Sequence, residues 1–250
     1  DNLYTYRTFK PNARVIYPYS TTKTGVDIIP LSTIQKKYPL AYDYLQKHKA
    51  LLNNPKRDIK PEPKTKEEWH RYGRHQSLDS CGLPSKIIVG VLSVGDKYAI
   101  DVHGTLISSG GTAGYCIVAI PTISDYSIYY IQAILNSKYL EWFSALYGEV
   151  FRGGYIARGT KVLKNLPIRK IDFSDTKQKA LHDKIVETQK ELISINDQID
   201  SNAGNKRVLA PLQGQFEREK INLNKLLAEL YNLGDDDSLI PLIKELYEAN

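Results

Sequence analysis

Two apolar stripes at helical spacing occupy residues 175–231, and they restrict this part of the chain to a pair of packed helices. The first stripe alternates spacings of four and three residues and consists of Leu181, Ile185, Thr188, Leu192, Ile195 and Ile199. The second consists of Leu209, Leu212, Phe216, Leu223, Leu226, Leu227 and Leu230. The polar segment 200–205 separates them, so the sequence predicts an antiparallel helical hairpin with a short turn. A last short helix is predicted over 239–247, after aspartates that suit a helix N-terminus.

Charge is distributed unevenly along the chain. Residues 1–170 carry 24 basic and 13 acidic side chains, a net charge of +11, whereas residues 171–250 carry 10 and 15, a net charge of −5. A basic body followed by an acidic tail indicates a nucleic-acid partner for the first part only. Charge alone leaves acidic proteins and anionic membranes open as partners.

Length and composition limit the remaining possibilities. The 250 residues suffice for a substantial core in one or two domains. No apolar run approaches the roughly 18 residues of a membrane span, and no signal peptide is recognisable, so we expect a cytoplasmic protein without a membrane partner. Cys81 and Cys116 are too few for a disulfide framework or a four-cysteine zinc site, and we expect no metal. The sequence contains no methionine, so we expect a fragment of a longer protein.

The first two thirds of the chain predict a mixture of strands and helices. A helix is predicted over 31–52, with Pro39 in a first turn, and an amphipathic helix over 127–147. The predicted strands are 14–19, 26–29, 86–94, 98–102, 115–120 and an edge strand over 163–168. Gly95-Asp96 is predicted to be the turn of a hairpin between two of them. Asp101 and His103 would then share one strand face as an ordinary hydrogen-bonded pair.

Segment 53–68 is predicted to be an exposed loop. It contains three prolines, five basic and four acidic residues, and almost nothing apolar. Its Asp58…Glu62-x-Lys64 pattern resembles a metal-dependent nuclease site only superficially, because Pro61 and Pro63 prevent the strand pairing that such a site needs. We expect Lys60 and Lys64 to contact DNA phosphates.

Segment 69–78 is rich in side chains that contact DNA. Arginine binds phosphate or guanine, glutamine pairs with adenine, and aromatic rings pack or stack. The candidate DNA-binding residues here are Arg71, Tyr72, Arg74, His75 and Gln76. The alternative is that Trp69 anchors a core and the charged side chains are merely solvated. The glycine-rich loop 108–114 lacks a nucleotide-binding spacing, and we expect it to bring Thr112 near DNA.

The most concentrated basic stretch is 151–170, with six basic residues and no acid. Gly153, Gly154 and Gly159 permit close backbone approach or positive φ, and Phe151 and Tyr155 flank the glycine pair. Such a combination suits a loop pressed against a polyanion. A tight turn followed by a solvated basic strand is equally compatible with the pattern. The candidate DNA-binding residues here are Arg152, Tyr155, Arg158 and Lys161.

Short landmarks along nearly the whole chain resemble one protein family in order and spacing. They are Ile16-Tyr-Pro-Tyr19, Tyr38-Pro-Leu-Ala-Tyr-Asp-Tyr-Leu45, Trp69-x-x-Tyr-Gly-Arg74, Lys86-Ile-Ile88, Tyr98-Ala-Ile-Asp101, Phe151-Arg-Gly-Gly-Tyr155, Leu166-Pro-Ile168 and Leu230-Tyr-x-Leu-Gly-x-x-Asp237. The sequence resembles the C-terminal specificity domain of TaqI-like adenine-N6 DNA methyltransferases, as found in type IIG restriction-modification enzymes.

The resemblance implies a fold, a partner and a division of labour. The implied fold is α+β, a mixed and partly barrel-like sheet with flanking helices over residues 1–172, followed by the helical hairpin over 173–250. The implied function is recognition of double-stranded DNA, which positions an N-terminal methyltransferase domain or a separate catalytic subunit. That catalytic part would bind S-adenosylmethionine and grip a flipped adenine with an Asn-Pro-Pro-Tyr/Phe motif. The motif is absent here, so we expect no cofactor, no catalytic residue and no activity in this chain alone.

Two other classes of function remain open from the sequence. The helical hairpin is compatible with a protein-interaction scaffold that dimerises, and a free-standing enzyme is the third hypothesis. A scaffold would have little affinity for DNA, whereas a recognition domain would bind random duplex with a steep salt dependence.

Overall fold

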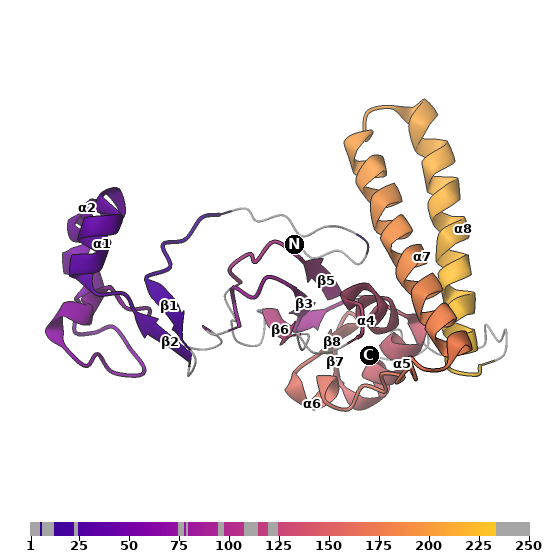
Figure 1. Cartoon of the computed structure of the whole chain (residues 1–250), viewed down its shortest axis with the longest axis horizontal. Helices are drawn as coiled ribbons and strands as arrows, with labels where there is room; N and C mark the ends of the chain where they lie inside the picture. The colour runs from indigo at the N-terminus through magenta and orange to yellow at the C-terminus, as the bar shows by residue number, and fades with distance from the viewer. Residues whose placement is uncertain are drawn as a thin grey trace. The chain divides into compact units, whose positions relative to one another are not determined.

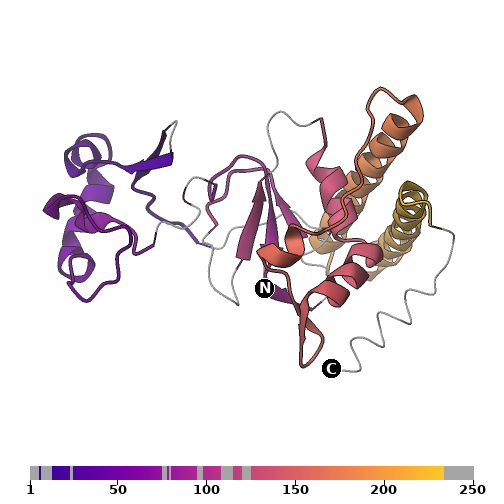
Figure 2. The same cartoon turned by 90° about the horizontal axis from the view of Figure 1, so that it is seen from below.

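The chain forms two compact units, 11–83 and 84–250 with 1–10 (Figure 1, Figure 2). The computed structural model describes residues 6, 13–22, 25–74, 78, 80–94, 98–107, 115–119 and 125–233. The sequence suggested a boundary at residue 172, but the structure divides the chain near residue 83. The helical hairpin shares a core with the sheets that precede it, whereas segment 11–83 packs on itself.

The small unit, 11–83, combines a β-hairpin with short helices. Tyr19 lies opposite Ile28 in the antiparallel pair. The elements are β1 (Tyr19–Thr22), β2 (Gly25–Ile28), α1 (Leu31–Lys37), α2 (Pro39–Lys47), α3 (Lys49–Leu52) and the 3-10 helix η1 (Lys66–His70). The first strand therefore begins at Tyr19, where the predicted strand ends, because Pro18 cannot donate a hydrogen bond within a sheet.

The predicted helix over 31–52 consists of three helices with two breaks. Tyr38 adopts φ −138° and ψ 60°, since the residue before a proline is disfavoured in helical geometry. Pro39 then occupies the first turn of α2, as predicted. His48 forms the second break and caps α2 through its backbone N–H.

Two groups of side chains form the interior of the small unit. Ile34, Leu45 and Trp69 make the apolar core. Trp69 is 4% exposed, which agrees with the core-anchor alternative for this residue. The Tyr72 ring packs edge-on against Tyr19 with centroids 5.2 Å apart.

The large unit contains two three-stranded antiparallel sheets. The first has the order β5-β3-β6 and the second β4-β8-β7. Their strands are β3 (Lys86–Gly90), β4 (Leu92–Ser93), β5 (Tyr98–Asp101), β6 (Tyr115–Ala119), β7 (Glu149–Phe151) and β8 (Tyr155–Ala157). The predicted strand 86–94 thus passes from one sheet to the other at Val91. None of the sheets among the described residues closes on itself, so a barrel-like arrangement is not supported.

Five helices of the large unit lie in its described part, and they depart from expectation at two places in the sequence. They are α4 (Ile128–Leu135), α5 (Lys138–Tyr147), α6 (Thr160–Leu163), α7 (Thr176–Ser201) and α8 (Lys206–Leu230). The predicted helix 127–147 breaks at Asn136 because Ser137 caps the next helix, its hydroxyl accepting from Leu140 N at 3.2 Å. The predicted edge strand over 163–168 is wrong: α6 is followed by irregular chain.

The predicted helical hairpin is confirmed, with a turn at 202–205 between α7 and α8 (Figure 1). The stripes are buried in their middle part, where Leu192 is 0% exposed and Leu223 2%, and half-buried toward the turn, where Ile199, Leu209 and Leu212 lie. Helix α4 contacts both α7 and the sheet strands β3 and β5, so the hairpin and the sheet share one core. The predicted helix over 239–247 lies outside the described residues.

Buried polar side chains connect the layers of this core. Gln132 donates to the Tyr98 carbonyl at 2.9 Å and accepts from Gln189 at 2.8 Å, which joins β5, α4 and α7. Asp101 pairs with Lys86 at 2.5 Å, and both side chains are fully buried. The expected hydrogen bond between Asp101 and His103 is present, but the His103 backbone N–H donates it to the Asp101 carboxylate at 3.0 Å. Because β5 ends at Asp101, the two residues do not share a strand face.

No helix of the described residues combines the length and apolarity that crossing a membrane requires.

Candidate nucleic-acid interface

The β7–β8 hairpin presents the centre of the basic stretch to solvent. Phe151 lies opposite Tyr155 in the strand register, and three residues join them in a tight loop. The neighbouring strand β4 pairs only with Ile156 and Ala157, so the Phe151–Tyr155 pair extends beyond the sheet. Figure 2 shows this hairpin projecting from the body of the large unit.

The loop of this hairpin needs its two glycines. Gly153 and Gly154 have φ of +85° and +74°, in the left-handed region that disfavours residues with a side chain. The Gly154 N–H donates to the Phe151 carbonyl at 3.1 Å and closes the turn. Arg152 is therefore the one residue of the three-residue loop that is not glycine, and its side chain is exposed. The tight turn predicted from the glycines is confirmed, although β8 ends at Ala157 and α6 follows.

Arg158 lies at the base of the hairpin and is 0% exposed. Its guanidinium donates to both carboxylate oxygens of Glu141 at 2.6 Å, and to the carbonyl and hydroxyl of Ser93 at 2.9 and 2.8 Å. The sequence predicted that Arg158 contacts DNA. Because no part of its side chain reaches the surface, Arg158 has a structural role in this chain instead. Arg158 instead ties α5, β4 and β8 together beneath the exposed tip.

Two further exposed basic side chains follow the β7–β8 hairpin in the sequence. Lys161 in α6 and Lys164 just after it are both exposed. Together with Arg152 they leave three solvent-exposed cations within fourteen residues of chain, and the buried Arg158 is separate from them.

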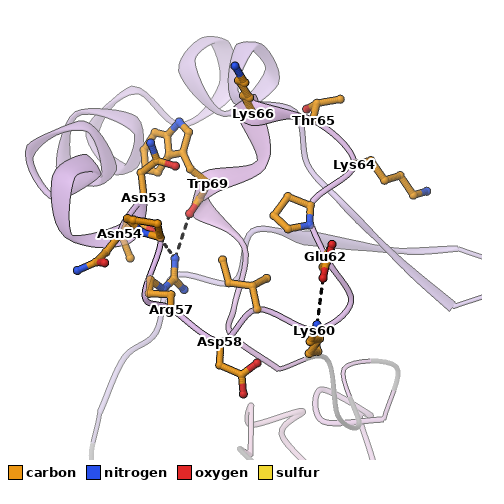
Figure 3. Close-up of a pocket in the computed structure, with 14 residues that line it drawn as sticks. Asn53, Asn54, Arg57, Asp58, Lys60, Glu62, Lys64, Thr65, Lys66 and Trp69 are labelled. Atoms are coloured by element: carbon orange, nitrogen blue, oxygen red, sulfur yellow. Dashed lines mark hydrogen bonds and ion pairs between the residues drawn. The ribbon is translucent and has the colours of Figure 1, made fainter.

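In the small unit, the proline-rich loop encloses an open cavity of about 640 Å³ (Figure 3). The cavity is lined by residues from the end of α3, the loop and the 3-10 helix, with Trp69 on its inner wall. Lys60, Lys64 and Lys66 all belong to this lining. Because the loop carries its lysines at the cavity rim, it could place cations against a polyanion.

Arg57 fixes this loop and was not recognised from the sequence. Its guanidinium donates to the carbonyls of Leu52, Trp69 and Arg71, the last two at 3.2 and 2.9 Å. Figure 3 shows the bond between Arg57 and Trp69. A charged donor shared among three backbone acceptors holds the two ends of the loop together. In the sequence Arg57 has the same appearance as its solvated neighbours, so no local signal distinguishes it.

Two exposed cations of the small unit are paired with acids on the same surface. Lys60 lies 3.0 Å from Glu62, and Arg74 forms an ion pair with Asp58. These pairs are more than half exposed, and such surface pairs contribute typically 0–1 kcal/mol, so a phosphate can compete for either cation. The Lys64 side chain is exposed as well.

Two candidates of this unit have structural positions. Arg71 is 6% exposed and forms an ion pair with Glu68. Tyr72 donates its hydroxyl hydrogen to the Ile16 carbonyl at 2.5 Å, and burial beside Tyr19 raises its pKa to about 12. Both side chains are therefore used by the fold of the small unit. His75, Gln76 and Thr112 lie outside the described residues.

The two units differ in net charge. Residues 11–83 carry 13 basic and 7 acidic side chains, which give +6, the whole net charge of the chain. The remaining residues carry 21 of each sign. The sequence division at residue 170 concealed this distribution, because the net charge of −5 over residues 171–250 belongs to the same unit as the basic stretch 151–170. Among the described residues no cluster of histidine, cysteine or carboxylate side chains could hold a metal ion.

Comparison with known proteins gives one informative similarity. No family model matches the sequence. The chain is 48% identical over 248 residues to the type II restriction enzyme and methyltransferase RM.Eco57I of Escherichia coli. The alignment covers 99% of this chain and 25% of that enzyme, so the chain spans about a quarter of the length of its curated relative. The chain is thus homologous to one part of a larger restriction and modification enzyme.

Proposed function

We propose that this chain is the DNA-recognition part of a type II restriction-modification enzyme. Its similarity to a quarter of RM.Eco57I supports a role within such an enzyme. The observation that carries recognition itself is the projecting tip of β7–β8, with Arg152 at its end and two glycines that narrow it.

A two-stranded ribbon fits the major groove of B-DNA, where bases differ in their hydrogen-bonding edges. Arg152 is the side chain at the tip that can donate two parallel hydrogen bonds to guanine O6 and N7. Tyr155 adds exposed contact surface beside it, 45% exposed. In this proposal the tip reads bases, and the exposed Lys161 contacts the sugar-phosphate backbone.

The small unit would supply phosphate contacts without base selectivity. Its net charge of +6 attracts DNA, and the loop lysines Lys60 and Lys64 lie at the rim of an open cavity. Arg74, which follows the 3-10 helix in the sequence, adds a third exposed cation. Phosphate contacts position a protein on the duplex but carry no direct sequence information.

Catalysis would reside elsewhere in the enzyme. A methyltransferase domain of the same polypeptide, or a catalytic subunit, would bind S-adenosylmethionine and modify an adenine. This sequence lacks the Asn-Pro-Pro-Tyr/Phe motif expected for that reaction. The chain alone would therefore bind DNA and transfer no methyl group.

The alternative of a dimerising scaffold has less support. A scaffold would use the apolar stripes of α7 and α8 between two copies of the chain. The central part of the stripes is buried against the partner helix and α4 within a single chain, with Ile185, Leu192 and Leu227 each 0% exposed. A dimer through this part of the stripes would require the core to open.

The test is selection of bound sequences from a random duplex pool, followed by titration of selected and random duplexes. We expect one sequence motif to be enriched. Arg152→Ala should weaken binding to the selected duplex by about 1–3 kcal/mol, while affinity for random duplex changes little. Lys164→Ala is the matched control, an exposed cation that should weaken both duplexes alike. Recovery of no motif, with equal affinity for all duplexes, would contradict a recognition function.

A further inference from the structure

The tip of the β7–β8 hairpin exposes an aromatic pair as well as an arginine. Phe151 is 42% exposed and Tyr155 45%, and the two are cross-strand partners on one face. The opposite face of the ribbon is Val150 and Ile156, of which Ile156 is 0% exposed and belongs to the interior. The outer face therefore presents part of two rings to solvent.

The surroundings of this pair favour DNA as its partner. Arg152 lies between the two rings in sequence, and no acidic residue occurs from there to residue 171. Glu149 is the next exposed residue on the same face and lies opposite Ala157. Because its carboxylate repels phosphates, the surface that suits a polyanion is limited to the tip of the hairpin. A polyanion can thus approach the outermost residues of the ribbon and no further.

An intact duplex offers few apolar groups to such rings. Stacking covers the faces of the bases, and the floor of the major groove presents hydrogen-bonding atoms and the C5-methyl group of thymine. Methylated cytosine would present the same group at the same carbon. We propose that Phe151 and Tyr155 bind a pyrimidine C5-methyl group in the major groove, next to the base contacted by Arg152. This inference rests on the proposed function and names the chemistry that the tip selects.

The decisive change is made on the DNA, so that it cannot disturb folding. A duplex pool selected by the wild-type chain is remade with deoxyuridine in place of thymidine, which removes only the methyl groups. We expect affinity to fall about fourfold for each methyl contacted, the value of one buried carbon. A third pool keeps thymidine and carries 5-methylcytosine in place of cytosine: tighter binding would assign a contact to a cytosine position, and unchanged affinity would assign the contact to thymine alone.

Protein variants locate the contact. Phe151→Ala and Tyr155→Ala should bind the thymidine and uridine pools equally, while Tyr147→Ala should retain the fourfold difference. Tyr147 is 61% exposed in the same unit but lies outside the hairpin, so it is the matched aromatic control.

Equal affinity of the wild-type chain for the thymidine, uridine and 5-methylcytosine forms of its selected pool would overturn the methyl contact and leave DNA recognition intact. Tighter binding to a duplex with a single-base bulge than to either form would overturn it as well, in favour of ring stacking on an opened base. Absence of any selected sequence would instead contradict the proposed function itself.

Discussion

Arg152 and Arg158 lie six residues apart and have opposite environments. Arg152 stands alone on a glycine turn in solvent, whereas Arg158 is enclosed by Glu141, Ser93 and the Ile156 carbonyl. A buried ion pair contributes little net stability, because both charges lose their hydration, but it fixes the geometry of what it joins. Here it joins the base of the β7–β8 hairpin to α5 and β4.

Removing one partner of that pair should be costly. Arg158→Ala leaves the Glu141 carboxylate buried without compensation, and we expect the free energy of unfolding to fall by roughly 3–5 kcal/mol. Replacing both partners, Arg158→Met with Glu141→Leu, should recover most of the loss. Urea unfolding of the two variants measures the difference, with Arg152→Ala, expected within about 0.5 kcal/mol of wild type, as the exposed control. Equal effects of Arg158→Ala and Arg152→Ala would refute the structural role of Arg158.

Tyr72 gives the small unit a dependence on alkaline pH. Burial and then the neighbouring Tyr19 raise its pKa from 10.0 to about 12. The folded state therefore holds this proton more tightly than the unfolded state, so the contribution to stability is complete below pH 10 and declines as the pH rises toward 12.

We expect Tyr72→Phe to flatten the decline in stability of the small unit between pH 10 and 12. At neutral pH the variant should lose about 1 kcal/mol, the value of the hydrogen bond to Ile16. Thermal unfolding followed by Trp69 fluorescence reports on this unit when Trp142 is replaced by Phe. Tyr38→Phe, at a position 56% exposed, is the control, and a decline as steep in Tyr72→Phe as in this control would exclude Tyr72 as the source.

At the scale of elements, α7 and α8 form a support for the sheet rather than a separate binding module. Their stripes meet each other, and α7 also packs on α4, whose other contacts are with β3 and β5. Asn196 of α7 further donates to the Tyr6 carbonyl at 3.0 Å, which joins Tyr6 to the same helix. The hairpin helices thus stabilise the unit that carries β7–β8.

Leu192→Ala should lower the free energy of unfolding by roughly 2–5 kcal/mol, because it opens a cavity at a fully buried position. Affinity for DNA, measured well below the melting temperature, should stay unchanged. Ile221→Ala in α8 is the surface control, since Ile221 is 56% exposed and should alter neither quantity. A loss of DNA binding by folded Leu192→Ala would indicate that the hairpin helices contact DNA themselves.

At the scale of the whole molecule, the net charge and the hairpin tip that we propose to read bases belong to different units. The small unit holds the entire net charge of +6, and the large unit holds the projecting aromatic and arginine tip. Affinity for any duplex and discrimination among duplexes should therefore be separable by mutation.

Lys60→Ala and Lys64→Ala should weaken selected and random duplexes by equal factors. Each should also reduce the slope of log K against log salt by about 1, the effect of one lost phosphate contact. Titrations between low and physiological salt measure the slope. Lys179→Ala on α7 is the matched control, an exposed lysine in an ion pair like Lys60, and should leave the slope unchanged. An unaltered slope in both loop variants would exclude the loop from the interface.

The sequence by itself determined the elements whose signals are local. The four-three spacing of Leu181 to Ile199 sufficed for α7, and the paired glycines sufficed for the turn after Phe151, because helical periodicity and positive φ depend on near neighbours. Pro39 likewise marked the start of α2.

Tertiary structure alone decided which basic residues are available and where the units divide. Arg158 finds Glu141 seventeen positions away and Ser93 sixty-five positions away, and Arg57 finds the Trp69 carbonyl across a loop. Strand β4 leaves the sheet of β3 to pair with β8, far along the chain. Such partners are brought together by packing of distant segments, and composition around each residue carries no trace of them. Arg152 and Arg158 therefore have similar sequence surroundings, and only the tertiary structure shows that the first is exposed and the second buried.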